Sequence, residues 1–405
     1  MSYYKLNKQH IDIDVNEIKI KVKLKNDDVY EKSHISKSVE KYLSRIKNNI
    51  NKYPNQWDNF KKISNPYEYI HTNIPKFKTS ISEYIPVSRA FFKFVEIYNQ
   101  NQLNEYFCKP IKSFHLAEGP GGFIEAINHV RSQNPRDLYY GITLIEDSQN
   151  IPNWNKLQSL IETQDNIIIE NGLDGTGDLF NPNNYNDLKE KYMGTMDLIT
   201  ADGGFDFSVN FNHQETQALR LLLTEVIYTF MLQKNGGVFI FKMFDTFKKA
   251  SIDILYLLSC FYEKINVVKP NTSRYANSEK YIVCKNFNYE EKNLQQINQK
   301  LYNILYVINK IDFNDFFIHS ILDLNYNLHF KNQIEELNII LANQQIENIQ
   351  HTIRLIENNE RKNEKLQQLQ HNNIQKCIQW CLRNNMKYNR LTQTTNIFKK
   401  NLLKV

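Results

Sequence analysis

Cysteine is scarce in this 405-residue sequence, and its few copies are scattered. The cysteines are Cys108, Cys260, Cys284, Cys377 and Cys381. They form no Cys-x-x-Cys pair, and their number is odd. We therefore expect neither a disulfide framework nor a structural zinc site.

Long hydrophobic segments are also absent. The sequence has no run of about 18 apolar residues and no apolar segment near its N-terminus. We therefore expect a soluble intracellular protein, in the nucleus or cytoplasm, or in a virus factory or virion if the source is viral. The 50 Lys and Arg against 44 Asp and Glu give a net charge of +6. This charge permits a polyanionic partner without requiring one.

The length suits one large domain with extensions on both sides. Residues 1–64 form a predicted N-terminal extension, in which the alternation at 11–25 indicates one or two strands and 36–51 a helix. Residues 289–405 are rich in Asn, Gln and Lys and are predicted to be a helical C-terminal region. Its isoleucines recur at heptad spacing from Ile339 to Ile356, which favours an intramolecular packing face over a dimeric coiled coil.

In the central segment, residues 65–288, continuous apolar runs alternate with stretches whose apolar residues have helical spacing. We predict strands at 113–118, 138–144, 166–170, 196–201, 236–243, 264–269 and 279–286. We predict helices from about 88 and at 122–132, 183–192, 213–234 and 247–262. Continuous apolar strands separated by helices are typical of a parallel α/β sheet covered on both faces. The connection between the last two strands is too short for a crossover helix, so these strands should pair antiparallel.

A glycine-rich turn follows the first strand of this segment. It reads Glu118-Gly119-Pro120-Gly121-Gly122-Phe123 and leads directly into a helix. Glycines let the backbone approach a ligand closely, and a helix N-terminus offers free N–H groups. The turn is neither a G-x-G-x-x-G motif nor a P-loop, so a purely structural turn is an equal alternative.

Four charged residues stand out. Three of them lie at or near the ends of predicted strands, and the fourth lies just before the sheet. Asp202 ends the fourth strand and precedes two glycines, whereas Lys242 is a single charge within an apolar strand. Glu279 begins the last strand, and Lys93 lies on an aromatic-rich helix. Ligands of α/β sheets lie beyond the carboxyl ends of the strands, and a buried lysine is costly unless paired. Taken singly, Lys93 and Glu279 are more typical of surface charges.

Together, Lys93, Asp202, Lys242 and Glu279 resemble the Lys-Asp-Lys-Glu tetrad of FtsJ-like (RrmJ-type) RNA 2'-O-methyltransferases. The flanking stretches narrow the resemblance to cap-specific mRNA (nucleoside-2'-O-)methyltransferases of the adrift type. These stretches are Asn65-Pro66-Tyr67-Glu68, Ser88 to Lys93, Glu118 to Phe123, Gly175 to Asp178, Thr200 to Asp206, Asn235 to Phe244, and Lys269 to Glu279. The resemblance covers about residues 60–287 and implies a class I (Rossmann-like) methyltransferase sheet, mostly parallel with an antiparallel last strand.

The resemblance also implies a cofactor, a substrate and partners. The cofactor is S-adenosylmethionine, held at its methionine part by Glu118, Gly119, Pro120, Gly121, Gly122 and Phe123 and at its adenine by Asp178. The substrate is capped mRNA, methylated at the ribose 2'-hydroxyl of the first or second nucleotide, and the partners are proteins of the capping or transcription machinery. Lys242 would stabilise the developing alkoxide or, if neutral, accept its proton. No metal ion is implied.

Basic residues around the predicted active-site mouth are candidates for phosphate contacts. They are Arg89, Lys248, Lys249, Lys269 and Arg274, together with Lys76 and Lys78. Two other functions stay open at this point. The first is a ribosomal or transfer RNA 2'-O-methyltransferase with the same tetrad, and the second is a non-catalytic RNA-binding accessory subunit. An N6-adenine methyltransferase is disfavoured, because Asn65-Pro66-Tyr67 lies too close before the glycine turn and the fourth strand ends in Asp-Gly-Gly.

Overall fold

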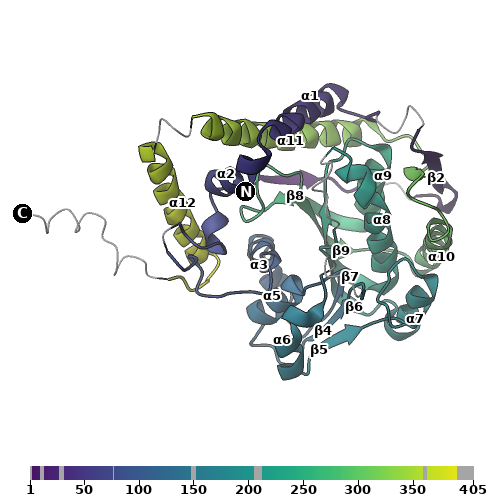
Figure 1. Cartoon of the computed structure of the whole chain (residues 1–405). Coiled ribbons are helices and arrows are strands. Elements are labelled where there is room, and N and C mark those ends of the chain that lie inside the picture. The colour runs from purple at the N-terminus through teal and green to yellow at the C-terminus, as the bar shows by residue number, and fades with distance from the viewer. Residues whose placement is uncertain are drawn as a thin grey trace, which may run out of the picture.

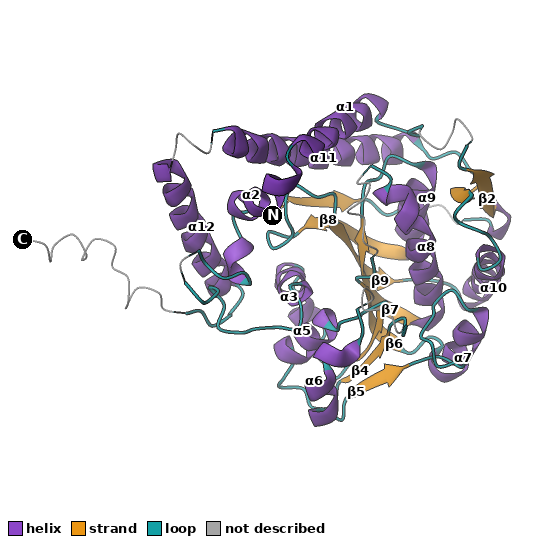
Figure 2. Cartoon of the chain, viewed as in Figure 1, coloured by secondary structure: helices purple, strands orange, loops and turns teal. Residues whose placement is uncertain are grey.

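A twisted sheet with helices on both faces forms the centre of the molecule in the computed structural model (Figures 1 and 2). The structure describes residues 2–9, 13–26, 32–75, 77–146, 152–204, 212–358 and 363–389. The strands are β1 (Ser2–Leu6), β2 (Ile18–Leu24), β3 (Lys112–Leu116), β4 (Leu138–Ile142), β5 (Ile167–Glu170), β6 (Met196–Ala201), β7 (Gln233–Met243), β8 (Tyr262–Lys269), β9 (Lys280–Phe287) and β10 (Phe316–Leu322).

The helices lie on the two faces of the sheet and in the flanking regions. They are α1 (Lys37–Asn48), α2 (Pro54–Ser64), α3 (Ala90–Gln100), α4 (Leu103–Tyr106), α5 (Gly122–Val130), α6 (Gln158–Thr163), α7 (Pro182–Tyr192), α8 (Gln214–Leu232), α9 (Lys249–Phe261), α10 (Glu291–Ile308), α11 (Leu328–Glu357) and α12 (Asn363–Arg383). Among the described residues, no helix combines the length and apolar character needed to cross a membrane.

The strand order of the large sheet is β1-β8-β9-β7-β6-β3-β4-β5. Strands β3 to β7 are parallel to one another, and β9 lies antiparallel between β7 and β8. This arrangement confirms the predicted mostly parallel sheet with an antiparallel last strand. The sequence did not predict β1, which pairs antiparallel with β8 at the sheet edge. Its five residues are too few to show an alternation.

Two apolar cores cover the faces of the sheet. Helices α3 and α5 pack on one face, where Phe92, Phe94 and Phe123 are fully buried. The other face is covered by α8 and α9, both of which are buried along most of their length. Figure 1 shows these two layers on opposite sides of the edge-on strands. Because both faces are covered, the strands between them are apolar almost throughout, as the sequence indicated.

The N-terminal and C-terminal flanks pack against each other. Strand β2 pairs with β10 in a separate two-stranded sheet, so the C-terminal region, which is helical as predicted, also contributes one strand at 316–322. Helices α1 and α2 pack on α11 (Figure 1). Ile346 and Ile349 of α11 are buried there, which confirms the intramolecular packing face. Ile339 is 46% exposed and lies outside it.

Candidate active site

The loops that follow β3, β4 and β5 meet at the carboxyl edge of the sheet. Thr143, after β4, accepts the N–H of Gly119 through Oγ1 at 3.1 Å. A Cβ on Gly119 would lie 2.3 Å from the carbonyl oxygen of Pro152, and one on Gly177 would lie 1.9 Å from the carbonyl oxygen of Thr143. The close packing of the loops therefore requires glycine at both positions. The turn is a structural necessity as well as a candidate ligand site.

Glu118 joins this turn to helix α5. Its Oε1 accepts the N–H groups of Phe123 at 2.6 Å and Ile124 at 3.1 Å, at the start of the helix. Its Oε2 is buried and has no hydrogen-bond partner among the described residues. Burial, with a further contribution from the Asp202 carboxylate, raises the pKa of Glu118 to about 8. A cationic ligand at this point would lower this pKa again and favour the ionised carboxylate.

The four residues of the predicted tetrad lie together as two ion pairs. Lys93 Nζ is 2.8 Å from Glu279 Oε1, and Lys242 Nζ is 3.3 Å from Asp202 Oδ1. Lys242 also donates a 2.7 Å hydrogen bond to the Asp202 carbonyl oxygen. Lys93, Lys242 and Glu279 are all buried. Asp202 follows β6 and Lys242 lies near the end of β7, so two neighbouring parallel strands bring these partners together.

Tyr281 connects the two ion pairs. Its hydroxyl donates to Asp202 Oδ1 at 2.7 Å and accepts from Lys93 Nζ at 3.3 Å. Sequence reasoning missed Tyr281, although it lies two residues after Glu279, and alternate residues of an extended segment share a face. Ser273 was missed too, and its Oγ donates to Glu279 Oε1 at 2.7 Å. The ion pairs and the two hydroxyls thus form one buried network.

The two tetrad lysines differ in electrostatic environment. Burial would lower the pKa of Lys242, but the carboxylates of Asp202, Glu279 and Glu225 together raise it above the ordinary lysine value. Burial lowers the pKa of Lys93, against the opposing effects of Glu279 and Asp202. Burial would also raise the pKa of Glu279, but the cations of Lys93 and Lys242 hold it well below the usual range. Lys242 is therefore an ammonium at neutral pH in this arrangement.

Glu225 is a second buried acid that the sequence analysis did not single out. It lies in α8, and its Oε1 is 2.5 Å from the position that a Cβ on Gly203 would occupy. Burial is the main cause that raises the pKa of Glu225 to about 8. The signal in the sequence was weak: one glutamate within the apolar run of 221–232. Glu225 lies behind the loop of Asp202 and contributes to the field at Lys242.

Two predicted RNA-contacting residues have internal partners. Arg274 donates from Nη2 to Glu68 Oε1 at 2.5 Å and from Nε to Glu68 Oε2 at 3.0 Å. Lys269 is 4% exposed and donates to the carbonyl oxygens of Asn277, at 2.8 Å, and of Glu279. Both side chains hold the loop that precedes Glu279. The acid that pairs with Arg274 is Glu68, which belongs to the stretch Asn65-Pro66-Tyr67-Glu68.

The other predicted residues have the following positions. Arg89 is half-buried at the start of α3. Lys248 forms an ion pair with Glu40 at 3.1 Å, and Lys249 forms one with Asp253 at 2.9 Å. Asp178 is half-buried in the loop after β5. Lys76, Phe205 and Asp206 lie outside the described residues.

Comparison with known families decides the class of this site. The family model described as FtsJ-like methyltransferase matches residues 86–287. These residues belong to the FtsJ-like methyltransferase family. The FtsJ-like domain thus contains both ion pairs, the glycine turn and Asp178, and its cofactor is S-adenosylmethionine.

Curated relatives of the chain carry names that refer to the mRNA cap. The chain is 32% identical over 203 residues to the cap-specific mRNA (nucleoside-2'-O-)-methyltransferase 2 of Drosophila melanogaster, covering 47% of the chain and 29% of that protein. It is 37% identical over 172 residues to the corresponding methyltransferase 1 of Trypanosoma cruzi, covering 42% and 46%. It is 29% identical over 342 residues to methyltransferase 1 of Dictyostelium discoideum, covering 74% and 42%. The chain spans less than half of each relative.

Proposed function

We propose that this protein transfers a methyl group from S-adenosylmethionine to the ribose 2'-hydroxyl of a cap-proximal nucleotide of mRNA. The observation that carries the proposal is the pair of buried ion pairs, Lys93 with Glu279 and Lys242 with Asp202, within an FtsJ-like domain. The cap as substrate is supported by the names of the relatives.

The tetrad acts on the hydroxyl mainly through electrostatics. Lys242 lies at the carboxyl edge of the sheet and carries a positive charge, so it stabilises negative charge that develops on the 2'-oxygen. An ammonium has no lone pair and cannot accept the proton, which leaves to water as the new carbon–oxygen bond forms. Asp202 holds Lys242 through its carboxylate and its carbonyl oxygen. Asp202 is held on its other side by the hydroxyl of Tyr281, which also contacts Lys93 in its ion pair with Glu279.

The donor set of the turn fits the cofactor. S-adenosylmethionine supplies an electrophilic methyl group on a sulfonium when it is bound. Its ammonium and sulfonium are cations, and either one placed beside the unpaired Oε2 of Glu118 would lower the raised pKa of this carboxyl and favour its ionised form. The segment from Gly119 to Phe123 would hold the methionine part, and Asp178 the adenine amino group. Arg89 and Lys248 are the candidates for phosphate contacts near the tetrad.

Three short RNAs and labelled S-adenosylmethionine test this function. The RNAs are capped, capped with the first nucleotide already 2'-O-methylated, and uncapped. Label on the capped RNA alone supports methylation of the first nucleotide, and label on the pre-methylated RNA points to the second. Equal labelling of the uncapped RNA contradicts cap specificity. Lys242→Ala is the control for chemistry, because its RNA binding should persist while transfer is lost.

Binding without any transfer by the wild-type protein would instead support the accessory subunit.

A further inference from the structure

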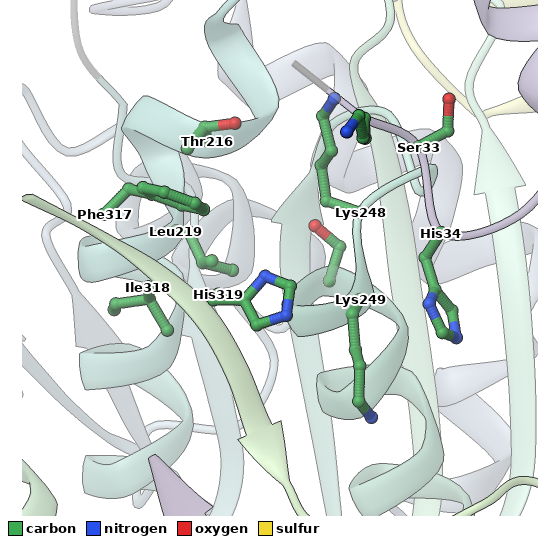
Figure 3. Close-up of a pocket in the computed structure, with 11 residues that line it drawn as sticks. Ser33, His34, Thr216, Leu219, Lys248, Lys249, Phe317, Ile318 and His319 are labelled. Carbon is green, nitrogen blue, oxygen red and sulfur yellow. The ribbon is translucent and has the colours of Figure 1, made fainter. Parts of the chain in front are cut away.

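A groove of about 620 Å³ lies between helix α1 and the N-terminus of α8. We call it the α1 groove. Its charged lining consists of Lys32, Lys37, Lys41, Lys248 and Glu40, and His213 lines it as well. The adjoining pocket in Figure 3 shares Lys32, Ser33, Thr216 and Lys248 with it. Lys249 points away from Lys248 in that view and does not line the groove.

The charge of the α1 groove is predominantly positive. The carboxylate of Glu40 already forms an ion pair with Lys248 at 3.1 Å. Lys37 and Lys41 are exposed and one helical turn apart, and within the described part of the chain they have no carboxylate partner. Leu43 and Ile46 lie on the opposite side of α1, buried against α11. Packing on α11 therefore holds the two lysines toward the groove.

The α1 groove lies at the same edge of the sheet as the tetrad. Helices α8 and α9 begin after β6 and β7, the strands that end near Asp202 and Lys242, so the N-termini of both helices face that edge. Gln214, at the start of α8, accepts a 2.7 Å hydrogen bond from Ser278 Oγ, next to Glu279. The start of α8 thus links the groove to the segment that carries Glu279.

We propose that the α1 groove binds the phosphates of the RNA chain that follows the methylated nucleotide. This inference rests on the proposed function. Among the described residues, the lining holds no aromatic side chain apart from the His213 imidazole, and its uncharged groups are hydroxyls and amides. This described lining offers contacts to phosphates rather than to base edges, so we expect binding that depends on salt more than on base sequence.

The double variant Lys37→Gln, Lys41→Gln tests the groove. Both side chains are exposed, and glutamine has a helix propensity close to that of lysine, so the fold should be retained. The matched control is Lys109→Gln, Lys112→Gln, which removes two exposed charges near the amino end of β3, at the opposite edge of the sheet. The variant Lys37→Arg, Lys41→Arg keeps both charges and should bind like the wild type.

Binding is measured against salt with a capped trinucleotide and a capped RNA of about 20 nucleotides. For the long RNA, the glutamine variant should weaken binding and reduce the slope of log K against log salt by about 1.4, which is two single-strand phosphate contacts. The trinucleotide and the control variant should show no change. An unchanged slope, or equal losses for both RNAs, would overturn the proposal. Binding needs no turnover, so failure of the proposed methyl transfer is detected separately, as absent labelling of the trinucleotide.

Discussion

The bidentate pair between Arg274 and Glu68 predicts a large, pH-dependent effect on stability. Glu68 is fully buried, and burial would raise its pKa, but the hydrogen bonds and charge of Arg274 lower it from 4.5 to about 2. Each pKa unit corresponds to about 1.4 kcal/mol, so the ionised Glu68 contributes about 3 kcal/mol at neutral pH. Because the folded pKa is depressed, this contribution is present above about pH 4.5 and is lost as the pH falls toward 2.

Arg274→Met should therefore lower the free energy of unfolding by at least about 3 kcal/mol at pH 7, since it leaves a buried carboxylate without its cation. Arg274→Lys keeps the charge but not the two-pronged geometry, and should cost about half as much. Denaturant unfolding at several pH values measures both. The difference between wild type and Arg274→Met should shrink below about pH 4.5.

A difference that stays constant down to pH 3, or a lysine variant as stable as the wild type, would refute this account of Arg274. Glu68→Gln separates the two partners in a double-mutant cycle with Arg274→Met. If Arg274 served only as a phosphate contact, the role for which it was a candidate from the sequence, both arginine variants would unfold like the wild type and would bind RNA less tightly.

Three further predictions concern the tetrad. Because the pKa of Lys242 is raised, Lys242 should stay protonated between pH 7 and 9. Its titration should therefore cause no increase in the single-turnover rate of methyl transfer over that range. A tenfold increase in this rate per pH unit would indicate that Lys242 is a general base. Tyr281→Phe removes the hydrogen bond to Asp202 and should slow transfer by about tenfold, corresponding to about 1.4 kcal/mol, without changing cofactor affinity measured by calorimetry. Glu225→Gln should fold like the wild type, whereas Glu225→Lys should unfold at a markedly lower temperature, because it would bury a second cation close to the ammonium of Lys242.

The sequence predicted the central sheet well because its signals are local. Continuous apolar runs marked strands that are covered on both faces, and Lys242 stood out as the single cation in one of them. Asp202 was found because a strand end followed by two glycines is a local pattern. The antiparallel β9 followed from the length of one connection, which is also read directly along the chain.

The residues that sequence reasoning missed depend on contacts between distant segments. Arg274 and Glu68 are separated by 206 positions, so nothing near Arg274 shows that it is paired. Strand β10 is short and lies between long helices, and only its pairing with β2 makes it a strand. Glu225 was hidden in an apolar helix, where its meaning depends on the loop of Asp202 lying against it.

Locating the transferred methyl group tests the central claim most directly. A capped RNA is incubated with the protein and labelled S-adenosylmethionine, digested to nucleosides and analysed by mass spectrometry, alongside the same RNA with 2'-deoxyribose at its first two nucleotides. The account predicts label on the ribose of a cap-proximal nucleotide, and none on the deoxy RNA. Label on a base, on the cap guanine, or undiminished on the deoxy RNA would contradict it.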